Sequence, residues 1–242
     1  FKSWLRELQG RGAGGERRGE VKTAAPLGAS VEPSPAPQTR HYETILSEQQ
    51  LDAWLARIGA SALVSVDTET TTLDPMTARL VGLSLSVEPH AGAYLPLAHT
   101  YAGAPVQLDA GRVLAALKPW LENATARKVG QNLKFDAHVF ANYGITLRGL
   151  EHDTLLQSYV LESHRPHDLD SLAGRHLDLT TISYDDVTGK GANRIAFEQV
   201  ELDRATEFSA EDADVTLQLH RVLYPQIEAD AKLTHIYRDI EM

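Results

Sequence analysis

The sequence predicts an α/β domain in which a mixed β-sheet is flanked by helices. Two alternating apolar stretches near residues 79–97 are typical of an antiparallel hairpin. Further along the chain, short strand-like stretches alternate with helix-like ones, which favours further strands in the same sheet. The chain has 242 residues, 43% of them hydrophobic, so it is long enough to bury a substantial core.

The first forty residues differ from the rest of the chain. Residues 1–8 form a short amphipathic piece that is too small to be a domain. Residues 9–40 are rich in Gly, Ala, Pro, Arg and Glu and lack a hydrophobic period, which is typical of a flexible linker. We therefore expect the ordered domain to begin near residue 41. Because the chain starts at Phe1 rather than at Met, we also expect it to be a fragment of a longer protein.

The first predicted helix and strand of the domain follow directly. Residues 47–58 carry apolar side chains at helical spacing, and Ser47 is a suitable N-cap. Residues 62–73 then begin as a strand of apolar and β-branched residues. This strand ends on two acids, Asp67 and Glu69, around which the functional prediction is built.

The rest of the domain is predicted to continue as a hairpin followed by alternating helices and strands. The hairpin comprises strands at 79–87 and 92–97, joined across E-P-H-A. In chain order we then expect a helix at 109–121, a strand at 127–130, a helix at 133–144, a strand end and helix at 151–161, a helix at 167–177, a loop at 184–193, and a helix at 199–223 that Pro225 interrupts.

Composition and charge exclude several classes of protein. The absence of cysteine excludes disulfides and thiolate metal sites and fits a reducing, cytoplasmic location. No apolar run is long enough for a membrane span, so we expect no membrane partner. The net charge is −10, made up of +3 over residues 1–40 and −13 over the remainder. Such an acidic domain attracts a phosphate backbone poorly, so cations or a neighbouring domain would have to hold nucleic acid.

Asp67 and Glu69 form the first candidate metal site. Residues i and i+2 of a strand point to the same face, so both carboxylates leave the same side of the sheet. Two anions this close repel each other, and a divalent cation with a preference for oxygen ligands, Mg²⁺ or Mn²⁺, relieves the repulsion. A solvated strand end is the simpler explanation for an isolated pair of this kind, so the pair needs acids from elsewhere.

Two further acids lie in long polar motifs. Asp136 ends K-V-G-Q-N-L-K-F-D, just inside a predicted helix, and Asp212 lies within F-S-A-E-D-A-D-V-T in the long helix. With the strand acids they would make four carboxylates, enough to ligate two divalent ions that clamp the attacking and leaving oxygens of a phosphodiester. Taken alone, each is better explained as an ordinary acid on a helix surface, because most Asp residues are exposed.

Three motifs, in this order and spacing, resemble one known family. D-T-E-T-x-x-L, K-V-G-Q-N-L-K-x-D and A-E-D-A-D-V-T-L-Q-L-H are similar to motifs of the 3′→5′ proofreading exonuclease domain of bacterial DNA polymerase I. The resemblance covers residues 41–225. It implies a ribonuclease-H-like fold and a site with two Mg²⁺, Mn²⁺ or Zn²⁺ ions. The implied metal ligands are Asp67, Glu69, Asp136 and Asp212.

The same resemblance implies the surroundings of the domain. Residues 1–8 look like the end of a 5′-nuclease region, and residues 226–242 look like the start of a polymerase region. The expected partners are therefore the polymerase region of the same full-length chain and the single-stranded or frayed 3′ end of DNA. A monomer in the bacterial cytoplasm is expected.

Four further positions match residues that contact DNA in that family. Leu73 matches an apolar wedge between the last bases, and Gln131 and Asn132 match polar contacts to the terminal nucleotides. Tyr184 stands where the family usually has a Phe that stacks on a base, which either aromatic ring can do. Ordinary core or loop packing is the alternative for Leu73 and Tyr184.

Phe208 is where the chain departs from the family pattern. Members of this branch have a Tyr four residues before the last Asp, whose hydroxyl holds the attacking water, whereas a related branch has a His at the position of Glu207. Phe208 should share a helix face with Asp212 but offers no oxygen. An attenuated exonuclease is therefore expected. The alternatives are a catalytically lapsed module that braces the polymerase or binds DNA, and an exoribonuclease of the same superfamily.

Overall fold

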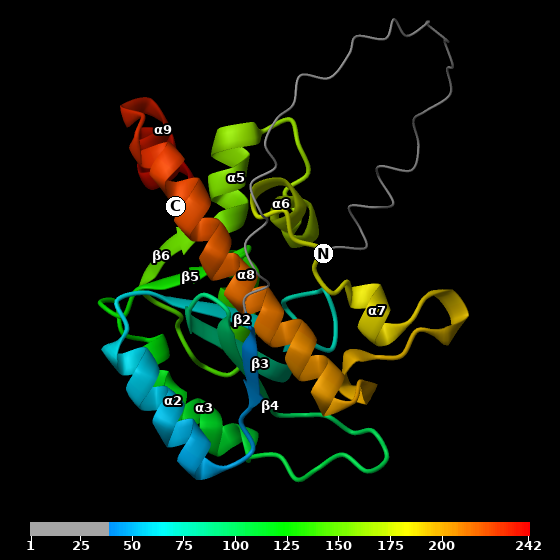
Figure 1. The fold of residues 1–242 in the computed structure, drawn as a ribbon. Coiled ribbons are helices and arrows are strands. Elements are labelled where there is room, and N and C mark those ends of the chain that lie inside the picture. Colours follow the sequence, from blue (N-terminus) through cyan, green and yellow to red (C-terminus); the bar gives the residue numbers. More distant parts are fainter. Residues whose placement is uncertain (1–38) are drawn as a thin grey trace, which may run out of the picture. The chain divides into compact units, whose positions relative to one another are not determined.

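A six-stranded mixed β-sheet lies at the centre of the computed structural model, which describes residues 39–242 (Figure 1). The strand order is β1-β4-β3-β2-β5-β6. The β2–β3 and β3–β4 pairs are antiparallel, and the β1–β4, β2–β5 and β5–β6 pairs are parallel. The strands are β1 (His41–Thr44), β2 (Val64–Thr70), β3 (Leu80–Glu88), β4 (Ala91–Pro96), β5 (Lys128–Gly130) and β6 (Leu150–Asp153). The predicted mixed sheet is confirmed, whereas the predictions for residues 1–38 lie outside the described residues.

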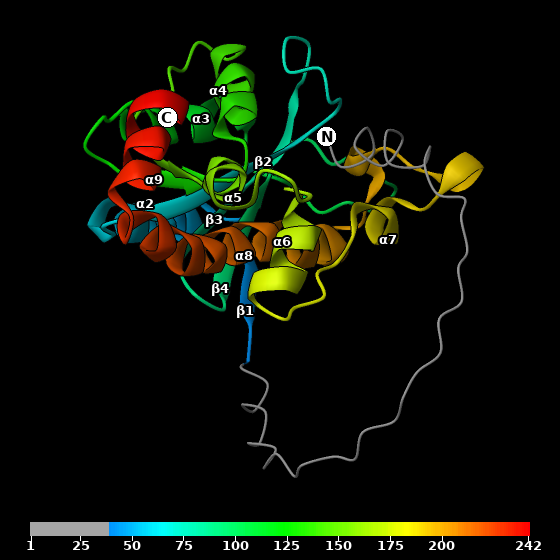
Figure 2. The same ribbon diagram turned by 90° about the horizontal axis from the view of Figure 1, so that it is seen from above.

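Helices cover both faces of this sheet. In Figure 2, α3 and α4 lie on one side of the strands and α8 lies on the other. The helices are α2 (Glu48–Ala60), α3 (Ala110–Leu121), α4 (Leu133–Ala141), α5 (Thr154–Glu162), α6 (Leu169–His176), α7 (Tyr184–Thr188), α8 (Leu202–Glu228) and α9 (Ala231–His235). Shorter helical turns span Gly191–Asn193, Phe197–Gln199 and Ile236–Glu241. Within residues 39–242, no helix is at once long and apolar enough to cross a bilayer.

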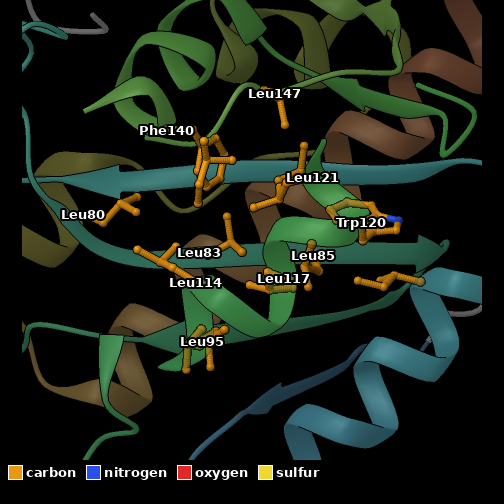
Figure 3. Close-up of a cluster of buried hydrophobic side chains, with 14 of the residues drawn as sticks. Leu80, Leu83, Leu85, Leu95, Leu114, Leu117, Trp120, Leu121, Phe140 and Leu147 are labelled. Carbon is orange, nitrogen blue, oxygen red and sulfur yellow. The ribbon is translucent and has the colours of Figure 1, made fainter. Parts of the chain in front are cut away.

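The largest core lies between the sheet and the α2, α3 and α4 helices. In Figure 3, leucines from β3 and β4, such as Leu83 and Leu95, meet Leu114 and Leu117 of α3. A second cluster packs the opposite face of the sheet, through Val81 and Tyr94, against the start of α8. The sheet is therefore held from both sides, and α8 is fixed closely over its central strands.

The start of α2 agrees with its prediction. Ser47 accepts a hydrogen bond from the Gln50 N–H, and the Gln50 side chain in turn accepts one from the Ser47 N–H. This reciprocal capping satisfies two donors at the helix start. Leu51, Trp54 and Ile58 are the buried residues of the helix, as the helical spacing of its apolar residues indicates.

Two predictions from the sequence were wrong. The stretch 184–193 contains the short helix α7, which Ser183 begins by capping it reciprocally with Asp186. Pro225 does not interrupt α8, which continues to Glu228. A proline in the last turn removes only one backbone N–H, and the burial of Leu223 and Ile227 holds the turn in place.

Candidate metal centre

Three carboxylates meet where α8 crosses the end of β2. One carboxylate oxygen from each of Asp67, Glu69 and Asp212 lies within 4.8 Å of the other two. Among the described residues, these three side chains form a group that could hold a metal ion. Glu69 and Asp212 are 8% and 7% exposed, and Asp67 is half-buried. The pairing of β2 with β3 shifts register between Glu69 and Thr70, so the regular strand ends directly after the second acid.

The donor set of this group suits a hard divalent cation. Carboxylate oxygens are the ligands that Mg²⁺ and Mn²⁺ prefer, and three anions this close repel one another strongly without a cation. Ser209, one helical turn before Asp212, donates its hydroxyl to Glu69 Oε1 at 3.0 Å. This bond orients one of the candidate ligands. Sequence reasoning missed it, and the one signal that could have found it is the i, i+3 spacing of Ser209 and Asp212 on the same helix.

Asp136, the fourth predicted ligand, lies outside this group of three. It is 2% exposed on α4, and its Oδ1 accepts a hydrogen bond from the Thr68 hydroxyl at 2.6 Å. Thr68 stands between the two acids of β2, so this hydrogen bond joins α4 to the part of the strand that carries them. Burial raises the pKa of Asp136 to about 7. The structure therefore brings three of the four predicted ligands together, and the fourth is hydrogen-bonded to the residue between the two acids of β2.

The other acids of the A-E-D-A-D motif fix α8 to its surroundings. Glu211 pairs with the Arg40 guanidinium and accepts the Ile182 N–H at 2.6 Å. Asp214 accepts hydrogen bonds from the Tyr42 hydroxyl and the His90 N–H, both at 2.8 Å. Neighbouring positions on a helix point in different directions, so only Asp212 of these acids joins the carboxylate group.

Phe208 lies in an aromatic cluster one turn before Asp212. Its side chain is 2% exposed, and its ring centroid is 5.8 Å from that of Phe197 and 6.1 Å from that of Tyr184. Tyr184 stacks on Phe197 and is half-buried. Burial raises the pKa of Tyr184 to about 12, and the charge of Glu69 adds to the rise. The Tyr184 ring therefore packs within the protein beside the carboxylates, and its stacking on a base stays a prediction.

The remaining predicted DNA contacts differ in their accessibility. Leu73 follows β2 and is 56% exposed, as a wedge between bases requires. The Gln131 side chain donates to the His167 carbonyl at 2.7 Å and is engaged within the protein. Asn132 has a left-handed backbone, with φ of 69°, and stands at the N-cap of α4. The role of all three in binding DNA stays a prediction.

Comparison with known proteins gives the family. The model of the 3′–5′ exonuclease family matches residues 42–228. The chain is 43% identical over its whole length to DNA polymerase I of Pseudomonas aeruginosa, and 40% identical over 83% of its length to DNA polymerase I of Rhizobium leguminosarum. It covers 26% and 21% of those two proteins, so it spans about a quarter of the length of the curated relatives that it matches.

Solved structures agree on the fold. The Pol1 POL domain of M. smegmatis has a TM-score of 0.62 at 22% identity, over 81% of this chain and 29% of that chain. Escherichia coli RNase D, an exoribonuclease, has a TM-score of 0.61 at 18% identity, over 83% of this chain and 49% of that chain. These likenesses confirm the ribonuclease-H-like fold. The family model, which matches residues 42–228, and the curated relatives identify the chain as a member of the 3′–5′ exonuclease family.

Proposed function

We propose that this chain is a metal-dependent exonuclease that removes nucleotides from the 3′ end of DNA, as the proofreading domain of a DNA polymerase I. The observation that supports the proposal is the group of three carboxylates, contributed by β2 and α8, with oxygens within 4.8 Å of one another. A catalytically lapsed bracing module is disfavoured, because all four predicted ligands are present.

Each of the proposed residues has a distinct part in the site. Asp67, Glu69 and Asp212 hold divalent cations, with Asp136 as the fourth ligand. Two such ions, when bound, stabilise the charge on the attacking and leaving oxygens of a phosphodiester. The Ser209 hydroxyl keeps Glu69 oriented through its 3.0 Å hydrogen bond. Mg²⁺ and Mn²⁺ suit these oxygen donors best, and Zn²⁺ is the further candidate.

The proposed substrate is a single-stranded or frayed 3′ end. The remainder of the chain after residue 40 carries a net charge of −13, so it attracts a duplex backbone poorly. Leu73 is exposed at the end of β2 and could insert between unpaired bases, and Gln131, Asn132 and Tyr184 are the other proposed contacts. The polymerase region of a longer chain is the proposed partner that holds the duplex.

The proposal is tested by incubating the chain with 3′-labelled single-stranded DNA, with and without Mn²⁺. We expect release of the labelled nucleotide only when Mn²⁺ is present and loss of the release in Glu69→Gln. Matched 3′-labelled RNA separates this proposal from an exoribonuclease, because the 2′-hydroxyl is the feature that distinguishes the two substrates. Failure to release label from DNA at millimolar Mn²⁺, or faster cutting of RNA than of DNA, would refute the proposal as stated.

A further inference from the structure

Asp153 holds the starts of two helices at once. At the start of α5, its carboxylate accepts the Leu155 and Leu156 N–H groups at 2.9 and 3.3 Å. At the start of α4, it accepts the Asn132 and Leu133 N–H groups at 3.1 and 2.8 Å. The residue is 5% exposed, so these backbone donors rather than water satisfy the buried charge.

Strand pairing explains why one residue reaches both helices. The β5 and β6 strands are parallel, and Gly130 at the end of β5 lies opposite Asp153 at the end of β6. The left-handed backbone at Asn132 turns the chain there from β5 into α4. The first N–H groups of α4 are therefore satisfied by the neighbouring strand, as happens where an anion binds at a helix start.

The C-terminal segment holds Asp153 from its backbone side. The Tyr237 hydroxyl accepts the Asp153 N–H at 2.9 Å and the Gln157 side-chain amide at 3.1 Å. Tyr237 is completely buried, and the next residue, Arg238, bonds to the Glu151 carboxylate at 3.0 Å. The side chain of Asp153 thus binds the two helix starts, and its backbone N–H binds Tyr237, which follows α9.

We propose that Asp153 is a positioning residue for Asp136, and that Tyr237 makes this positioning depend on the C-terminal segment. Leu133, which Asp153 holds, begins the helical turn that carries Asp136. A displaced helix start would therefore move the Asp136 carboxylate relative to Thr68 and β2. The inference rests on the proposed function, because the place of Asp136 matters to activity only if the carboxylates hold ions.

The test compares the full 242-residue chain with Asp153→Asn and Tyr237→Phe. Asn keeps the size of Asp but turns an amide NH₂ toward backbone donors. We measure hydrogen exchange at the Asn132 and Leu133 amides, the Mn²⁺ concentration that gives half-maximal cutting of labelled single-stranded DNA, and Mn²⁺ binding by calorimetry. In Asp153→Asn we expect faster exchange at both amides and a Mn²⁺ requirement raised by about tenfold or more, as for other residues that orient metal ligands. Tyr237→Phe should shift the exchange rates and the Mn²⁺ requirement in the same direction, but by a smaller amount than Asp153→Asn does.

A matched control is Asp109→Asn. Asp109 caps α3 by accepting the Arg112 N–H at 2.9 Å, and α3 carries none of the residues proposed for the metal centre. This variant should lower the melting temperature slightly while leaving the Mn²⁺ requirement unchanged. The control thus separates the general cost of losing a helix cap from the specific displacement of Asp136.

The outcomes separate this inference from the proposed function. If the parent chain neither binds Mn²⁺ nor cuts DNA, the proposed function is wrong. The exchange rates of the Asn132 and Leu133 amides then still test whether Asp153 holds the start of α4. Unchanged exchange at the α4 start in Asp153→Asn overturns that role, and changed exchange with an unchanged Mn²⁺ requirement overturns the positioning of Asp136. A shift in Asp153→Asn with none in Tyr237→Phe overturns the link to the C-terminal segment. If Asp153→Asn does not fold, Tyr237→Phe decides by the same measurements.

Discussion

Replacing Asp212 by Asn should stabilise the metal-free protein while removing its nuclease activity. The variant keeps the shape of the side chain and its capacity to accept a hydrogen bond, but it removes one of three negative charges whose oxygens lie within 4.8 Å of one another. Without a cation, the parent chain must keep these like charges together in a largely buried place. The variant should therefore be the more stable protein in a chelator and the less active one with metal.

The structure sets the size of this effect. Two unit charges 4.8 Å apart repel by about 3 kcal/mol at an effective dielectric constant of about 20. Proton uptake by one carboxylate of the parent chain relieves part of this repulsion. We therefore expect the free energy of unfolding of Asp212→Asn to exceed that of the parent by about 1–2 kcal/mol. For a domain of this size, that corresponds to a rise of about 2–8 °C in the melting temperature.

Melting curves with EDTA and with Mn²⁺ test the prediction, alongside cutting of labelled single-stranded DNA. Mn²⁺ at about 100 times its dissociation constant should stabilise the parent by about 2.7 kcal/mol, and it should stabilise Asp212→Asn much less. The order of stability of the two proteins should therefore invert between EDTA and Mn²⁺. An Asp212→Asn protein that melts below the parent in EDTA, or that keeps the full shift with Mn²⁺, would refute the shared carboxylate site.

Three further predictions concern other parts of the molecule. Phe208→Tyr should raise the single-turnover cutting rate by about tenfold to a hundredfold, because the new hydroxyl would orient the attacking water. This gain corresponds to a barrier lower by about 1.4–2.7 kcal/mol. A variant that melts at a lower temperature and cuts no faster would show that Phe208 is a packing residue only. Single-stranded 3′ ends should be cut faster than blunt duplex ends, and equal rates of label release from the two would contradict the proposed substrate. Burial lowers the pKa values of His152 and His220 to about 3 and about 4. Below pH 6.5 these histidines therefore bind protons in the unfolded state but stay neutral in the folded state. Stability should thus be lost at up to about 1.4 kcal/mol per histidine per pH unit, and His220→Asn should flatten the pH dependence of the melting temperature between pH 6.5 and 5; an identical slope in parent and variant would contradict this.

The closeness of the two acids of β2 could be predicted from the sequence because strand periodicity is local. Alternation along 62–73 requires only that a strand exists, and it correctly predicted that Asp67 and Glu69 share a face. The cap of α2 at Ser47 could be predicted for the same reason, since its partners lie within three residues. Such features depend on neighbours in the chain and not on how distant elements pack.

Features that depend on the pairing of distant elements could not be predicted from the sequence. The place of Asp136 against Thr68 depends on how α4 lies beside β2. The double role of Asp153 depends on the register that sets Gly130 beside it. The continuation of α8 past Pro225 depends on tertiary burial that outweighs a local helix-breaking preference. In each case the deciding contact joins residues far apart in the sequence.

The buried acids on either side of Asp212 give the carboxylate group its rigidity. The repulsion within the group would push α8 away from the sheet, yet Glu211 and Asp214 tie the helix to Arg40, Tyr42 and the turn before β4. Gly92 also allows α8 to lie close to β4, because a Cβ at this position would lie 2.9 Å from the Ala210 carbonyl oxygen. The helix is therefore held against the strands by contacts that involve no cation. Under the proposed function, Asp212 would already lie beside β2 before an ion binds.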